Sequence, residues 1–291
     1  MRANQDRMTR RQMISRTTAA AGGLALSATL APLFAGEARR RFKIGACEWS
    51  LRKSDPSSLE VAKQIGLDGV QVNLGSAGDQ MHLLQPAVQQ AYLDAAKRTG
   101  VAISSLAIAE MNNVPLKSDP RAEQWLADSI EVLQALNLKI VLVAEFSKGD
   151  LFDDRAGVDR TVEVLKRLAP KAEKAGVIFG LENYLSASEN LEILRRVGSP
   201  AVQVYYDVGN STDKGYDIYQ EIRMLKGKVC EFHAKDGDFM LGQGRIDFRK
   251  VRAAMDDINF SGWIQIEAAA PHELVSDYQK HYNFLKGVFN A

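Results

Sequence analysis

Short apolar runs alternate with longer amphipathic segments along the chain from residue 42 onward. The short runs are rich in Val, Ile, Leu and Phe, which is typical of buried strands. There are eight of them. The predicted strands are FKIGACEW (42–49), DGVQVNL (68–74), VAISSLAIA (101–109), KIVLVAE (139–145), VIFGLEN (177–183), VQVYYD (202–207), KVCEFHAKD (228–236) and GWIQIEA (262–268).

The segments between these runs carry apolar residues three and four positions apart, which predicts helices. They lie near residues 57–65, 86–99, 120–136, 157–175, 188–197, 215–226, 247–257 and 273–287. In the fourth, Val158, Val162 and Leu165 follow helical spacing, whereas Pro170 predicts a kink or an early stop because it lacks an N–H. Glycine follows several of these segments, as in KRTGV and EKAGV, and is the expected C-terminal stop.

Eight strand-then-helix units predict an α/β fold, a single-domain (β/α)₈ TIM barrel over residues 42–291. The alternative is a doubly wound open sheet, which needs fewer strands and usually a glycine-rich phosphate loop after the first one. Here EWSLRKSDP follows the first strand. GQGRI (242–246) follows the seventh strand and does not match the dinucleotide fingerprint, so we interpret it as a turn.

Composition and charge are those of an ordinary globular protein, with 46% apolar and 25% charged residues. Residues 1–41 hold eight Arg and two acids, net +6, so the formal total of +1 leaves −5 on residues 42–291. A mildly acidic barrel has no basic surface to follow a phosphate backbone, and we expect no nucleic-acid partner. A homo-oligomer is compatible with this composition.

The basic residues near the N-terminus cluster in MTRRQMISR, which precedes the uncharged run TTAAAGGLALSATLAPLFA. This order predicts an export signal over residues 1–38, with cleavage after Ala35 or Ala38. The adjacent Arg10 and Arg11 resemble the twin-arginine type. We therefore expect a periplasmic or secreted protein with no membrane span in the mature chain. The alternative is an uncleaved membrane anchor, since the run is about long enough to span.

The two cysteines, Cys47 and Cys230, both lie inside apolar strand-like runs. Two cysteines cannot form a disulfide scaffold. A single disulfide is an alternative in an oxidising compartment, but we expect buried free thiols.

Polar residues close most of the predicted strands. In a TIM barrel, such residues face the active-site mouth at the C-terminal ends of the strands. They are Glu48, Asn73, Glu110, Glu145, Glu182, Asp207, His233 and Glu267. The last four come from strands five to eight and offer three carboxylates and one imidazole. Because converging carboxylates repel one another without a cation, this set predicts a divalent metal ion, Mn²⁺ first, with Mg²⁺, Co²⁺ or Zn²⁺ as alternatives.

The motifs around these four residues resemble the sugar phosphate isomerase/epimerase family, whose xylose isomerase-like members include ketohexose 3-epimerases and inosose isomerases and dehydratases. The matching motifs are GLEN with Glu182, YYDVGN with Asp207, EFHAKD with His233 and IQIE with Glu267. The resemblance implies that all four bind the metal and that Glu182 and Glu267 are also the acid/base pair. It further implies a small carbohydrate substrate and proton transfer beside a carbonyl through an enediolate.

Five further residues are candidate substrate contacts: Lys235, Asn210, Glu145, Trp49 and His272. Lys235 shares a strand face with His233. For Glu145 and Lys235 a structural ion pair is the alternative, and for Trp49 an ordinary core position. Ketohexose epimerases carry a His where this chain has Asn210 and an Arg a few residues after the seventh-strand His. Phe239 stands in that second region, which argues against a small free ketohexose.

We therefore expect a metal-dependent isomerase or epimerase acting on a keto-sugar or keto-glycoside. One alternative is a lyase or dehydratase that shares the first step and then expels a group from a 3-keto-glycoside. Two others are an AP-endonuclease-like enzyme, which the acidic barrel disfavours, and a sugar-binding barrel without turnover.

Overall fold

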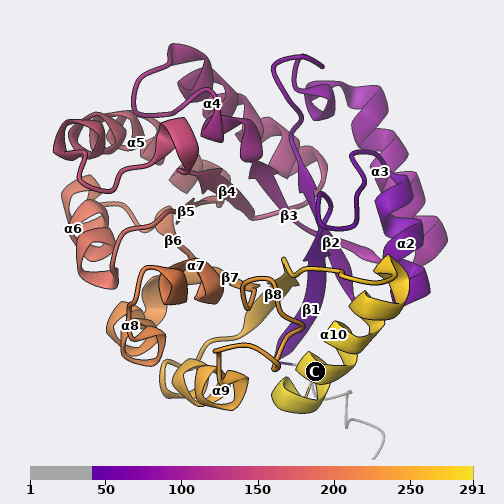
Figure 1. Cartoon of the computed structure of the whole chain (residues 1–291). Coiled ribbons are helices and arrows are strands. Elements are labelled where there is room, and N and C mark those ends of the chain that lie inside the picture. Colours follow the sequence, from indigo (N-terminus) through magenta and orange to yellow (C-terminus); the bar gives the residue numbers. More distant parts are fainter. Residues whose placement is uncertain (1–40, 291) are drawn as a thin grey trace, which may run out of the picture. The chain divides into compact units, whose positions relative to one another are not determined.

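The computed structural model describes residues 41–290. Their strands form a closed parallel barrel in sequence order, with the first strand paired to the eighth (Figure 1). The strands are β1 (Phe42–Cys47), β2 (Gly69–Asn73), β3 (Ala102–Ile108), β4 (Ile140–Ala144), β5 (Ile178–Glu182), β6 (Val202–Asp207), β7 (Val229–Ala234) and β8 (Gly262–Ile266). The predicted TIM barrel is confirmed.

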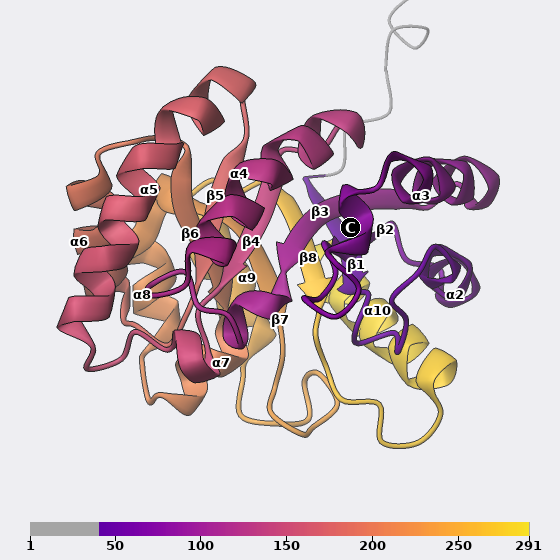
Figure 2. The ribbon, with the colours of Figure 1, turned by 90° about the horizontal axis from the view of Figure 1, so that it is seen from above.

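Helices surround this barrel as an outer ring, and α10 packs against α2 to close it (Figures 1 and 2). They are α2 (Ser57–Ile65), α3 (Pro86–Thr99), α4 (Pro120–Ala135), α5 (Arg155–Ala175), α6 (Ala187–Val197), α7 (Val208–Asp213), α8 (Ile218–Leu225), α9 (Phe248–Asp257) and α10 (Leu274–Phe289). No helix within residues 41–290 is long and apolar enough to cross a membrane.

Side-chain alternation along each strand separates two cores. On β4, Val141 and Val143 belong to the large core under the helices, whereas Leu142 and Ala144 face a smaller cluster inside the barrel with Tyr205. Successive side chains of a strand point to opposite faces, so each strand supplies both cores. This alternation decides which strand-end residues face the mouth.

The helix predicted near residues 157–175 is confirmed, and only the early stop at Pro170, one of two alternatives, is wrong. Helix α5 does not stop at Pro170 but continues to Ala175. Pro170 lies on the exposed face, where water can bond the carbonyl that it leaves unpaired, while Leu165 and Ala172 hold the other face in the core. The helix predicted near residues 215–226 is preceded by a separate short helix, α7, which the side chain of Asp207 caps.

Both cysteines of the described chain are free, as predicted, but only Cys47 is fully buried, whereas Cys230 is partly buried. The predicted export signal, residues 1–38, lies outside the described residues.

Candidate metal centre

Four side chains from consecutive strands converge at the C-terminal end of the barrel. Glu182 ends β5, Asp207 ends β6, His233 lies near the end of β7, and Glu267 directly follows β8. Strand register sets Asp207 directly opposite His233. Each residue offers one ligand atom, and these atoms lie within 4.8 Å of one another. The structure therefore brings together all four residues that the sequence proposes as ligands.

His233 lies at the centre of this group and is fully buried. Its Nδ1 lies 2.8 Å from Glu182 Oε1, 3.8 Å from Asp207 Oδ2 and 3.8 Å from Glu267 Oε2. The same nitrogen thus faces all three carboxylates, which is the placement expected of a metal-binding atom.

Asp207 is held by the helix that follows it. Its Oδ1 accepts hydrogen bonds from the backbone N–H groups of Gly209 at 2.6 Å and Asn210 at 2.8 Å. Its Oδ2 is buried and has no hydrogen-bond partner among the described residues. Since a buried carboxylate oxygen without a partner is costly, this atom fits a ligand to a cation.

Burial and mutual repulsion shift the acidity of the carboxyl groups. Burial, followed by the charges of Glu182 and Glu267, raises the pKa of Asp207 to about 7. Burial also raises the pKa of Glu182. Burial acts in the same direction on Glu267, but the positive charges of His233 and Lys235 outweigh it and lower the pKa. Three close carboxylates need positive charge, so the donor set fits a hard divalent cation such as Mn²⁺ or Mg²⁺.

Glu267 is oriented by one donor on each oxygen. Trp49 Nε1–H donates to Oε1 at 2.8 Å, and the Lys235 ammonium donates to Oε2 at 3.1 Å. The Lys235 stem passes close to Gly209, where an added Cβ would lie 2.8 Å from Lys235 Cβ. Glycine at this position therefore lets the lysine reach the centre.

The other predicted substrate contacts lie in different places. Asn210 is largely buried in α7, next to Asp207. Glu145 is buried and accepts a hydrogen bond from Asn183 Nδ2 at 3.1 Å, which itself bonds Asn190 of α6. Burial raises the pKa of Glu145 to about 8. The His272 side chain is 75% exposed and lies 3.4 Å from Asp277. The structure thus brings Trp49 and Lys235 to the centre, and it places Asn210 where its backbone N–H bonds Asp207, but Glu145 and His272 make no contact with the centre.

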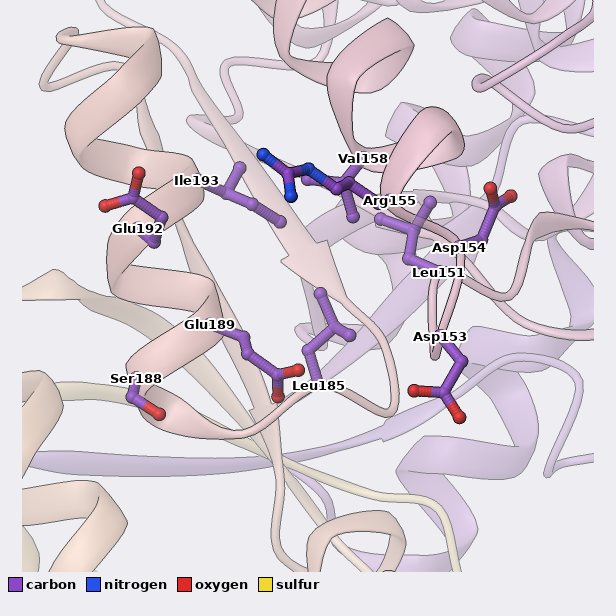
Figure 3. Close-up of a pocket in the computed structure, with 10 residues that line it drawn as sticks. All are labelled: Leu151, Asp153, Asp154, Arg155, Val158, Leu185, Ser188, Glu189, Glu192 and Ile193. Atoms are coloured by element: carbon purple, nitrogen blue, oxygen red, sulfur yellow. The ribbon is translucent and has the colours of Figure 1, made fainter.

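A separate pocket of about 490 Å³ lies between the beginning of α5 and α6 (Figure 3). Leu151, Val158, Leu185 and Ile193 form its apolar walls, and acidic side chains such as Glu189 line its rim. None of the predicted site residues lines this pocket. It contributes nothing to the metal centre.

Sequence reasoning from strand ends missed polar residues inside the barrel. Gln71, Tyr205, Glu231 and Gln265 are buried in strand interiors below the four predicted ligands. One signal was available, because each of the two glutamines interrupts an apolar strand, as in GVQVN and GWIQI.

Comparison with known proteins identifies the family. The family model of xylose isomerase-like TIM barrels matches residues 59–288 of this chain. The chain belongs to this family. A 2-epi-5-epi-valiolone 7-phosphate 2-epimerase of Actinoplanes sp. is 26% identical over 73% of this chain and 82% of its own length. An L-ribulose-5-phosphate 3-epimerase of Escherichia coli K12 is 25% identical over 72% of this chain and 80% of its own length.

Several solved structures share the fold. A D-psicose 3-epimerase of Clostridium cellulolyticum superposes with a TM-score of 0.72 at 18% identity, covering 85% of this chain and 99% of that protein. A 3-keto-D-glucoside 4-epimerase of E. coli superposes with a TM-score of 0.68 at 14% identity, covering 84% and 99%. All four of these relatives and structural neighbours are named as epimerases.

Proposed function

We propose that this protein is a divalent-metal-dependent epimerase that removes and returns a proton beside the carbonyl of a keto-sugar or keto-glycoside. The observation that carries the proposal is the cluster of Glu182, Asp207, His233 and Glu267, whose ligand atoms lie within 4.8 Å of one another. The names of the homologues support an epimerase.

Each residue of the centre has a role in this proposal. All four residues would bind the ion, Asp207 and His233 as ligands alone, and Mn²⁺ is the best match to the donors. When bound, the cation supplies positive charge that stabilises the enediolate. Glu182 and Glu267 come from β5 and from the end of β8, so they approach from different strands and can exchange the proton on two faces of the substrate. Trp49 and Lys235 orient Glu267 for this transfer.

The substrate class is inferred from two structural neighbours and two sequence positions. One structural neighbour is named for a 3-keto-D-glucoside and another for D-psicose. Asn210 and Phe239 replace the His and Arg expected of a ketohexose epimerase. We therefore favour a keto-glycoside over a small free ketohexose, with Lys235 and Asn210 as contacts to its oxygens.

Solvent hydrogen exchange tests the reaction. Ketoses and 3-keto-glycosides are incubated with the protein in D₂O, with chelator, and with chelator followed by Mn²⁺. We expect deuterium at the carbon beside the carbonyl, loss of exchange with chelator, and recovery with Mn²⁺. Glu267→Gln should lose exchange. Absence of deuterium in every substrate, or exchange by Glu267→Gln at the parental rate, would rule out the mechanism, and an unsaturated product would indicate a lyase.

We also propose that residues 1–38 direct export of the folded protein. Replacing Arg10 and Arg11 together by Lys should retain the protein in the cytoplasm, measured by cell fractionation. Unchanged distribution between the compartments would contradict a twin-arginine signal.

A further inference from the structure

A polar layer lies inside the barrel below the predicted ligands. Glu231 precedes His233 by two residues, and Gln265 precedes Glu267 by two, so their side chains point into the barrel one layer deeper. Both are fully buried, as is Gln71 of β2. TIM barrel interiors are usually filled by branched apolar side chains, and buried polar groups cost free energy unless they are bonded. This layer therefore needs a reason.

Gln71 connects the layer to the metal centre. Its Oε1 lies 2.9 Å from His233 Nε2 and 3.4 Å from the thiol of Cys47. Its Nε2 donates to the Tyr205 hydroxyl at 3.0 Å. The amide thus presents its oxygen to the imidazole and its nitrogen to the phenol.

We propose that Gln71 is the positioning residue that keeps His233 competent as a metal ligand, by accepting a hydrogen bond from Nε2–H and leaving Nδ1 unprotonated. This inference rests on the proposed function, because it requires the metal. Every contact of His233 with the carboxylates is made by Nδ1. A reversed amide would donate to Nε2 and move the proton to Nδ1, where an N–H would repel a cation.

Tyr205 connects Gln71 to the rest of the layer, because its hydroxyl accepts from Gln71 and is also hydrogen-bonded to the Glu231 carboxylate. The ring of Tyr205 packs on His233, with centroids 4.6 Å apart. Beyond Tyr205, Glu231 Oε1 accepts from Ser105 Oγ at 2.9 Å and from Gln265 Nε2 at 2.5 Å. A hydroxyl that donates to Glu231 must accept from Gln71, so turning the Gln71 amide would break this chain of hydrogen bonds.

Metal affinity and the His233 proton test the proposal together. Gln71→Met keeps the length of the side chain but removes the acceptor. We expect the Kd for Mn²⁺, measured by isothermal titration calorimetry, to rise about 10- to 100-fold. In ¹⁵N-histidine spectra of the Zn²⁺-loaded wild-type protein, we expect a hydrogen-bonded His233 Nε2–H, and we expect this signal to shift or exchange faster in Gln71→Met.

Matched variants separate positioning from general damage. Gln265→Met removes the other buried amide of the layer, which makes no contact with His233, and should leave the Kd within about threefold of wild type. Gln71→Glu restores an acceptor for Nε2–H and should recover most of the affinity. A Gln71→Met protein that binds Mn²⁺ within twofold of wild type overturns the inference.

The wild-type protein alone also tests the hydrogen bond, so an unstable variant does not remove the test. A His233 proton on Nδ1 in the metal-loaded wild type overturns the inference. If the wild type binds no divalent cation at all, the proposed function fails with it. If it binds Mn²⁺ and Gln71→Met binds equally well, the inference fails alone.

Discussion

The two halves of the barrel mouth carry similar carboxylates but use them differently. In the β5–β8 half, Glu182 and Glu267 converge on His233. In the β1–β4 half, Glu48 also follows a strand, yet its Oε1 accepts hydrogen bonds from Tyr92 Oη at 2.5 Å and Ser58 Oγ at 3.0 Å. These partners lie on α3 and α2, so Glu48 fastens helices to the barrel.

Strand alternation explains the difference. The Cys47 side chain faces the interior, where it contacts Gln71, and the Ala144 side chain packs in the interior cluster. The residues that follow them, Glu48 and Glu145, therefore face the helices. Position at a strand end is thus an incomplete criterion for a site residue, because the face of the strand matters equally.

The largest expected effect is on catalysis in the β5–β8 half. Glu182→Gln removes a ligand and a proton-transfer group, so turnover at saturating Mn²⁺ should fall about 10³-fold or more. Glu110 lies just beyond β3, and Glu110→Gln is the matched control. Its turnover should stay within about threefold of wild type. If the turnover of Glu182→Gln fell by less than tenfold, the proposed difference in role between the two halves would be wrong.

The second expected effect is on stability in the β1–β4 half. Glu48→Leu removes the acceptor of Tyr92, Ser58 and the Asn73 backbone N–H, and should lower the free energy of unfolding by about 3 kcal/mol. Turnover per folded molecule should be unchanged. Urea denaturation and active-site titration measure the two quantities, and a stable but inactive variant would contradict the structural role.

The third expected effect is a dependence of folding stability on pH. This dependence should differ between the metal-free and the Mn²⁺-loaded protein. Burial raises the pKa of Asp207 to about 7, whereas an unfolded Asp has a pKa of about 4. Between these values the metal-free folded state binds more protons than the unfolded state, so stability falls as pH rises. We expect a loss of about 1–3 kcal/mol from pH 5 to 8 in urea denaturation, and a smaller loss with Mn²⁺.

Glu48 provides the internal control for this measurement. Burial raises its pKa to about 7 as well, so it adds the same slope to both forms of the protein. The difference between forms then isolates the metal centre. Asp207→Asn should reduce the slope of the metal-free protein, and equal slopes for the metal-free and metal-loaded wild type would contradict the prediction.

The smallest effect concerns the orientation of Glu267. Trp49→Phe keeps a ring but removes the donor to Oε1, while Lys235 still holds Oε2. We expect kcat to fall about fivefold, consistent with one hydrogen bond of about 1 kcal/mol. Trp263→Phe, at the opposite end of β8, is the control. A loss above a hundredfold would instead indicate direct substrate contact by Trp49.

The sequence alone predicted the barrel, because the apolar period changes regularly between strand and helix along the chain. It also located Glu182, Asp207, His233 and Glu267, since parallel strands bring their C-terminal ends to one face. Short-range rules did not predict α7, although the Asp207 side chain that caps it is visible in YYDVGN.

Only the tertiary structure decided which polar residues support the centre. Glu145 ends a strand but bonds Asn183, and Gln71 lies mid-strand but bonds His233, 162 residues away. Local periodicity specifies which segments form strands and helices, because those forces act between near neighbours. Hydrogen bonds across a closed barrel join residues distant in the chain, and their partners are fixed only when all eight strands pair in register.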